Sequence, residues 1–122
     1  QTPIEKPGGF PDVSFTTTNG AIRIHENTNH FAEVGVRNGF IYVDTTHAWN
    51  EIPAPLVQEI PAPTKEIDFK VIVDRGSIEV FAAGGTVVLT NLVLVETSLN
   101  YVEIMGEVNN LKLQRLYREQ QG

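Results

Sequence analysis

Three charged side chains around one turn form the strongest candidate for chemistry in this sequence. Asp74 and Arg75 open an Asp-Arg-Gly-Ser turn, and Glu79 follows in the strand after it. A carboxylate accepts hydrogen bonds and a guanidinium donates two in parallel, which suits a ligand with neighbouring hydroxyl groups. The same groups also suit internal bonding, with Asp74 capping the turn and Arg75 paired with Glu79 or another acid. Both interpretations remain open.

The position of Glu79 in its strand predicts which face it lies on. Its neighbours Ile78 and Val80 are apolar and are expected in the core. Because side chains alternate along a strand, Glu79 is expected on the opposite face, together with Ser77 and Phe81. A carboxylate beside an aromatic ring could bind a sugar. The same pair of residues is also common on an ordinary solvent-exposed sheet face.

Trp49, the only tryptophan, lies in the polar segment Thr46–Glu51. An aromatic ring can stack on the C–H face of a sugar, and loops on a rigid scaffold often carry binding residues. Alternatively, Trp49 packs its loop onto the core. Tyr42 is near in sequence and could belong to either arrangement.

Four residues invite a metal interpretation: His25, Glu26, His30 and Glu33. Their spacing matches no zinc signature, so we predict a solvated hairpin surface instead. The sequence indicates no cofactor. A structural calcium site stays open, because backbone carbonyl ligands leave no mark in a sequence.

Composition narrows the class of partner. The chain has 122 residues, a net charge of −6 and no cysteine. An acidic chain is a poor match for nucleic acid or an anionic membrane surface, and lack of cysteine removes disulfides and thiolate chemistry. No apolar run approaches the roughly 18 residues of a membrane span, and the first residues do not resemble a secretion signal.

Short strand-like segments and turn residues predict an all-β fold, an antiparallel two-sheet β-sandwich of the jelly-roll or lectin-like kind. Asn19-Gly20 and Asn38-Gly39 are each predicted to close a hairpin, and Gly84-Gly85 a turn. Residues 111–116 fit a strand better than a helix. We expect an extended lead-in or linker at 1–12, the sandwich at 13–118 and a polar tail at 119–122.

The region 47–64 is predicted to be a long surface loop. It repeats Ile-Pro-Ala-Pro, and its four prolines exclude a central strand because proline cannot donate to a sheet ladder. Polyproline character is therefore expected there.

The segment 71–92 resembles the C-terminal β-sandwich of the invertase, inulinase and levanase family of glycoside hydrolases. It also resembles related modules that bind fructans. That module carries an Asp-Arg-Ser-Ser turn before a Glu-Val-Phe strand, and here Gly76 stands where serine is usual. The matching residues are Val73, Asp74, Arg75, Ser77, Ile78, Glu79, Val80, Phe81, Gly85, Leu89 and Thr90. Asp44 matches an aspartate of the family's upstream strand, while Thr45 replaces an arginine.

The resemblance implies a non-catalytic module that binds terminal fructosyl units of fructans such as levan or inulin. The family's nucleophile and acid motifs are absent from this sequence, and nothing marks a carboxylate pair as the acid and nucleophile of a retaining glycosidase. A linked fructan hydrolase domain and secretion are further expectations from the resemblance. The candidate ligand-binding residues are Asp74, Arg75, Glu79, Asp44, Tyr42 and Trp49. The alternative is a sandwich that only braces a catalytic domain or a dimer interface.

Overall fold

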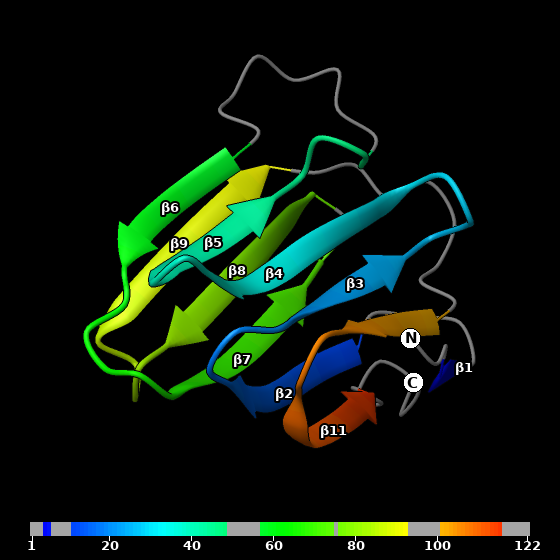
Figure 1. Cartoon of the computed structure of the whole chain (residues 1–122). Coiled ribbons are helices and arrows are strands. Elements are labelled where there is room, and N and C mark those ends of the chain that lie inside the picture. Colours follow the sequence, from blue (N-terminus) through cyan, green and yellow to red (C-terminus); the bar gives the residue numbers. More distant parts are fainter. Residues whose placement is uncertain (1–3, 6–10, 49–56, 75, 93–100, 116–122) are drawn as a thin grey trace.

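The chain forms two antiparallel sheets packed face to face (Figure 1). The computed structural model describes residues 4–5, 11–48, 57–74, 76–92 and 101–115. Among these residues there are strands and turns but no helix, so none that could cross a membrane. The predicted all-β sandwich is thereby confirmed.

One sheet, sheet A, has six strands in the order β1-β10-β3-β4-β5-β6, and the other, sheet B, has five in the order β11-β2-β7-β8-β9. The strands of sheet A are β1 (Ile4–Glu5), β10 (Tyr101–Met105), β3 (Ala21–His25), β4 (Phe31–Arg37), β5 (Phe40–Asp44) and β6 (Val57–Pro61). The strands of sheet B are β11 (Asn109–Arg115), β2 (Pro11–Thr17), β7 (Ile67–Val73), β8 (Ser77–Ala82) and β9 (Val87–Leu92).

Alternating apolar residues build the core between the sheets. In β7, Ile67, Phe69, Val71 and Val73 are buried while Asp68 and Lys70 are exposed. The cross-strand pair Phe15 and Phe69 stacks with ring centroids 4.7 Å apart. Each sheet therefore has one face in the core and one outer face, and the outer faces point in opposite directions.

The two Asn-Gly pairs behave differently. Asn38-Gly39 closes the β4–β5 hairpin, with φ values of 53° and 78° as a type I′ turn requires. The hairpin predicted at Asn19-Gly20 is wrong, because β2 lies in sheet B and β3 in sheet A. A Cβ on Gly20 would lie 2.5 Å from the carbonyl oxygen of Glu107, so this glycine allows the close packing of the chain where it crosses between sheets.

The predicted proline-rich loop is also partly wrong. Residues 57–61 form β6, which pairs with β5 at the edge of sheet A. An edge strand tolerates proline, here Pro61 at its end, because one side needs no ladder donor. The strand predicted at 111–116 is confirmed for residues 111–115, which lie in β11, and Leu116 lies outside the described residues.

Candidate carbohydrate-binding site

The Asp-Arg-Gly-Ser turn joins β7 to β8, as predicted. The backbone amide of Asp74 donates to the carbonyl of Ser77 over 2.8 Å, which closes the turn, and the Asp74 side chain is exposed. Gly76 is also exposed, and a Cβ built on it would meet nothing within 4 Å. Arg75 lies outside the described residues. The turn therefore presents Asp74 to solvent at one end of sheet B.

Glu79 lies on the outer face of sheet B, as its sequence neighbours predicted. Ser77, Glu79 and Phe81 are each half-buried, and they alternate with the buried Ile78, Val80 and Ala82. Across the strands, Glu79 lies opposite Ile72 of β7 and Thr90 of β9. Phe81 lies opposite Lys70 and the exposed Val88. We call the surface made by Asp12, Ile72, Glu79, Phe81, Val88 and Thr90 the open face.

Two acids on the open face have carboxylate oxygens without partners in the described part of the chain. The Glu79 carboxylate makes no hydrogen bond or ion pair with the described residues. Oδ1 of Asp12, which lies opposite Ile72 in the same row, is buried and has no hydrogen-bond partner. Because a buried polar atom is normally satisfied, Oδ1 of Asp12 is the unusual atom of this face, and the half-buried Glu79 carboxylate lies in the same row. A ligand that donates hydroxyl groups would satisfy them.

The outer face of sheet A also carries charges, but they are used internally. Glu33 accepts from Nε of Arg23 over 2.8 Å with one carboxylate oxygen and from the hydroxyl of Tyr42 with the other. The guanidinium of Arg37 lies 4.0 Å from the centre of the Tyr42 ring and 3.4 Å from the Glu59 carboxylate. We call this surface, with Glu103 and His25, the paired face.

Tyr42 is enclosed by these neighbours and is only 3% exposed. Burial, with the hydrogen bond to the Glu33 carboxylate, raises the pKa of the Tyr42 hydroxyl well above its usual value. Asp44 is half-buried at the end of β5, and its carboxylate accepts from the backbone amide of Thr46 over 2.8 Å. Both of these residues therefore have internal roles.

A row of stacked rings crosses the paired face. His25 stacks on Tyr101 at 4.4 Å and lies 4.8 Å from Phe31, which in turn stacks on His47 at 4.9 Å. The face of a ring that covers another ring is not available to stack on a sugar. His25 also bonds Glu103 over 2.9 Å and the carbonyl of Asn27.

This row corrects one prediction from the sequence. The segment with His25 and Glu26 is no solvated hairpin surface, because these side chains are 3% and 6% exposed. Among the described residues, no group of three or more histidine or acidic side chains could hold a metal ion.

The structure therefore separates the six predicted site residues. Asp74 and Glu79 lie on the turn and outer face of sheet B, whereas Tyr42 and Asp44 lie in β5 of sheet A. One monosaccharide cannot contact Glu79 and Tyr42 together, because the outer faces of the two sheets point away from each other. Trp49, like Arg75, lies outside the described residues. Sequence reasoning missed Asp12 and Thr90, which strand register alone brings beside Glu79.

Comparison with known proteins identifies the class to which this sandwich belongs. Residues 12–116 match the family described as "Glycosyl hydrolases family 32 C terminal". The chain is 30% identical over 118 residues to the levanase of Bacillus subtilis (strain 168), a match that covers 90% of this chain and 16% of the levanase. The chain belongs to the family of C-terminal domains of glycosyl hydrolase family 32.

Solved structures share the fold. The exo-inulinase of Aspergillus awamori matches with a TM-score of 0.71 and 19% identity, over 93% of this chain and 26% of the enzyme. The fructofuranosidase of Schwanniomyces occidentalis, solved with fructose, matches with a TM-score of 0.57 and 18% identity, over 93% of this chain and 29% of the enzyme. Congerin II, as a double mutant, matches at 0.59 and 8% identity over 93% of this chain and 98% of its own. The chain thus spans a small part of these hydrolases.

Proposed function

We propose that this chain is a non-catalytic carbohydrate-binding module that holds terminal fructosyl units of fructans on its open face. Its relatives supply the substrate class, since one is a levanase and another an exo-inulinase. In this role the module acts with a linked hydrolase domain of a secreted enzyme. It raises the local substrate concentration at the active site without taking part in the reaction.

The observation that carries the proposal is the Glu79 carboxylate on the open face, without a partner in the described residues. Glu79 accepts hydroxyl protons of the sugar, and Thr90 offers a hydroxyl on the neighbouring strand. Phe81 provides apolar area beside them. Asp74 is exposed at the end of this face, and in this proposal Asp74 and Arg75 add contacts to the same sugar.

The affinity of one such site is weak. A fructosyl ring has little apolar area, and its hydroxyl groups must leave water before they bond the protein. A hydrogen bond to a charged group contributes about 1.5–3 kcal/mol, so loss of the Glu79 carboxylate is expected to weaken binding roughly 10- to 150-fold.

The test is affinity electrophoresis in gels with levan or inulin, using Glu79→Ala and the control Glu59→Ala. Glu59 is a fair match, because its carboxylate also lies on an outer sheet face and is 45% exposed. We expect the wild type and Glu59→Ala to be retarded and Glu79→Ala to be retarded much less, with folding checked by thermal denaturation. No retardation of the wild type by either polymer contradicts the proposal. Equal retardation of both variants would remove Glu79 from the site.

A second candidate function is favoured by the apolar part of the open face. Val88 is 53% exposed and lies opposite the half-buried Phe81, and the half-buried Ile72 lies on the far side of β8, opposite Glu79. Such a patch also suits packing against a catalytic domain, in which case the sandwich is a brace and binds no sugar. Val88→Lys separates the two functions, because it would abolish co-elution with a family 32 catalytic domain on size exclusion. It would leave the Glu79 carboxylate in place.

A further inference from the structure

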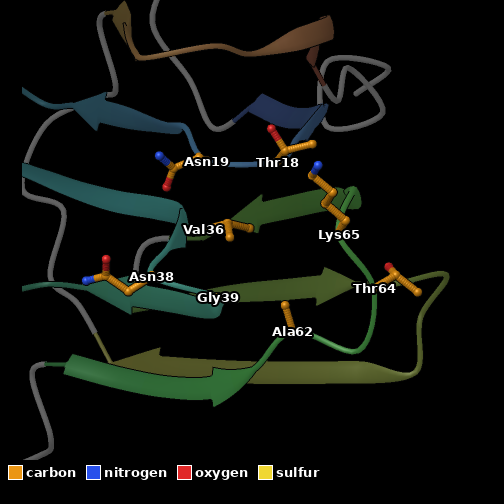
Figure 2. Close-up of a pocket in the computed structure, with 8 residues that line it drawn as sticks. All are labelled: Thr18, Asn19, Val36, Asn38, Gly39, Ala62, Thr64 and Lys65. Atoms are coloured by element: carbon orange, nitrogen blue, oxygen red, sulfur yellow. The ribbon is translucent and has the colours of Figure 1, made fainter.

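A pocket lies at the opposite end of the sandwich from the Asp74 turn. Its volume is about 390 Å³, which falls within the range of small-molecule sites. The residues that line it come from the β2–β3 connection, the β4–β5 region and the segment after β6: Thr18, Asn19, Val36, Asn38, Gly39, Ala62, Thr64 and Lys65 (Figure 2). Strand β7 separates the two ends, and its seven residues span about 20 Å.

Backbone hydrogen bonds tie the walls of the pocket together. The amide of Ala62 donates to the carbonyl of Gly39 over 2.8 Å, and the amide of Val36 donates to the carbonyl of Gly20 over 2.9 Å. These bonds join all three segments that form the pocket. Gly20 and Gly35 are packed so closely that a Cβ on Gly35 would lie 2.2 Å from the Gly20 carbonyl oxygen. The pocket is therefore preformed, which lowers the entropy cost of binding.

The chemistry of the lining is unlike that of the rest of the chain. The protein carries 15 acidic and 9 basic residues, yet no lining residue is acidic and the one charged member is Lys65. Figure 2 shows the Lys65 side chain extending toward Thr18, with Val36 and Ala62 on the apolar side of the pocket. Lys65 has no ion pair among the described residues.

Amide and hydroxyl groups complete the lining. Asn19 and Asn38 can each donate and accept hydrogen bonds, and so can the hydroxyl of Thr18. Thr64 donates its own hydroxyl hydrogen to the carbonyl of Glu66 over 2.8 Å, which leaves its oxygen lone pairs as acceptors. Hydrogen-bond donors and acceptors surround the apolar side chains of Val36 and Ala62. Such a lining suits a sugar ring, which carries hydroxyl groups at its rim and C–H groups on its faces.

We propose that this pocket is a second carbohydrate site, which binds one hydroxyl-rich sugar unit of the same polymer. This inference rests on the proposed function, since the fructan supplies the sugar. Glu79 lies opposite Ile72, which is five residues along β7 from Ile67 at the pocket end, so about 17 Å of strand separates the two sites. A trisaccharide bound at one site therefore leaves the other empty. A long or branched polymer reaches both, so the module binds polymer more tightly than short oligosaccharide through avidity.

The test is an amide NMR titration with a neutral fructan trisaccharide, followed by affinity electrophoresis with levan. The pocket variant is Asn38→Gly with Lys65→Ala. Asn38 has a φ of 53°, so glycine removes its amide group without straining the turn. Lys112→Ala, an exposed lysine of β11 outside the pocket, is the control for loss of one surface charge. Inorganic phosphate is titrated separately.

We expect two groups of shifted amides in the wild type, one around Gly39 and Thr64 and one around Ser77 and Phe81. The pocket variant loses the first group and keeps the second, whereas Glu79→Ala does the reverse. The pocket variant also weakens binding to levan roughly tenfold or more, and Lys112→Ala does not.

Each other outcome has a definite meaning. Shifts confined to the open face overturn the second site and leave the proposed function standing. Shifts confined to the pocket keep the second site and remove the open face from the proposed function. Pocket shifts with phosphate but not with the trisaccharide show an anion site and overturn the inference. If the trisaccharide shifts neither group, both proposals are wrong.

Discussion

Replacing Tyr42 by phenylalanine tests whether the Tyr42 hydroxyl is held by its hydrogen bond to Glu33 or is available to a ligand. The change keeps the ring under the Arg37 guanidinium and removes only the hydroxyl that donates to Glu33. A hydrogen bond to a charged acceptor contributes about 1.5–3 kcal/mol, so Tyr42→Phe is expected to lower the free energy of unfolding by about that amount at neutral pH. Sugar binding should be unchanged.

The pH dependence makes this prediction sharper. The pKa of Tyr42 is raised in the folded protein, by burial first and then by the Glu33 carboxylate. The unfolded chain loses this proton near pH 10, whereas the folded chain keeps it to higher pH. The stabilisation is thus fully present below about pH 10 and is lost as the pH rises above it, by about 1.4 kcal/mol per pH unit. Tyr42→Phe lacks this loss.

The measurement is urea unfolding of both proteins between pH 7 and pH 11. The difference in unfolding free energy should be constant up to about pH 9 and should shrink by about 1 kcal/mol between pH 10 and pH 11, because half of the unfolded chains still hold the proton at pH 10. The remaining titrating groups are the same in both proteins and cancel in the difference. A difference near zero at pH 7, or one that grows above pH 10, would refute the buried hydrogen bond. Loss of levan retardation in a stable Tyr42→Phe protein would place Tyr42 in the binding site instead.

Three further substitutions test the packing, each by urea unfolding at neutral pH. Gly35→Ala should lower the unfolding free energy by about 3 kcal/mol or more, because its Cβ would lie 2.2 Å from the Gly20 carbonyl oxygen; an unchanged midpoint would contradict that packing. Gly76→Ser should change it by no more than about 0.5 kcal/mol, since a Cβ there meets nothing within 4 Å; a large loss would show that the turn is tighter than described. Phe69→Ala should cost about 3–5 kcal/mol through loss of the ring stacked on Phe15, and a cost below 1 kcal/mol would place this ring outside the core.

The alternation of apolar residues predicted the strands and faces well, because each strand has one buried face. Glu79 lies where its neighbours Ile78 and Val80 placed it. Turn residues predicted the strand connections less reliably. Asn38-Gly39 and Asn19-Gly20 read alike in the sequence, yet only the first closes a hairpin. The difference lies in the close contact of Gly20 with the carbonyls of Glu107 and Met105, which are far away in sequence.

The candidate site was harder to predict than the fold, because it also depends on contacts between residues that are far apart in the sequence. Asp12, Ile72, Glu79 and Thr90 form one row because β2, β7, β8 and β9 pair in a particular register. A single sequence shows which residues share a face of one strand, but it does not show which strands are neighbours. The grouping of Tyr42 with Glu79 failed at this step, since β5 and β8 belong to different sheets.

The two functions that we propose, sugar binding and bracing, require the same outer face of sheet B. On the paired face, a partner that docked over Arg23, Glu33 and Tyr42 would have to break bonds already made. The open face has an acid whose carboxylate has no partner among the described residues, and a 53% exposed valine on the next strand, so it suits either a sugar or a second domain. They cannot occupy it together, because Glu79 and Val88 are diagonal neighbours on adjacent strands, about 7–8 Å apart. A module braced through this face would therefore retain the pocket beside Lys65 as its route to a sugar.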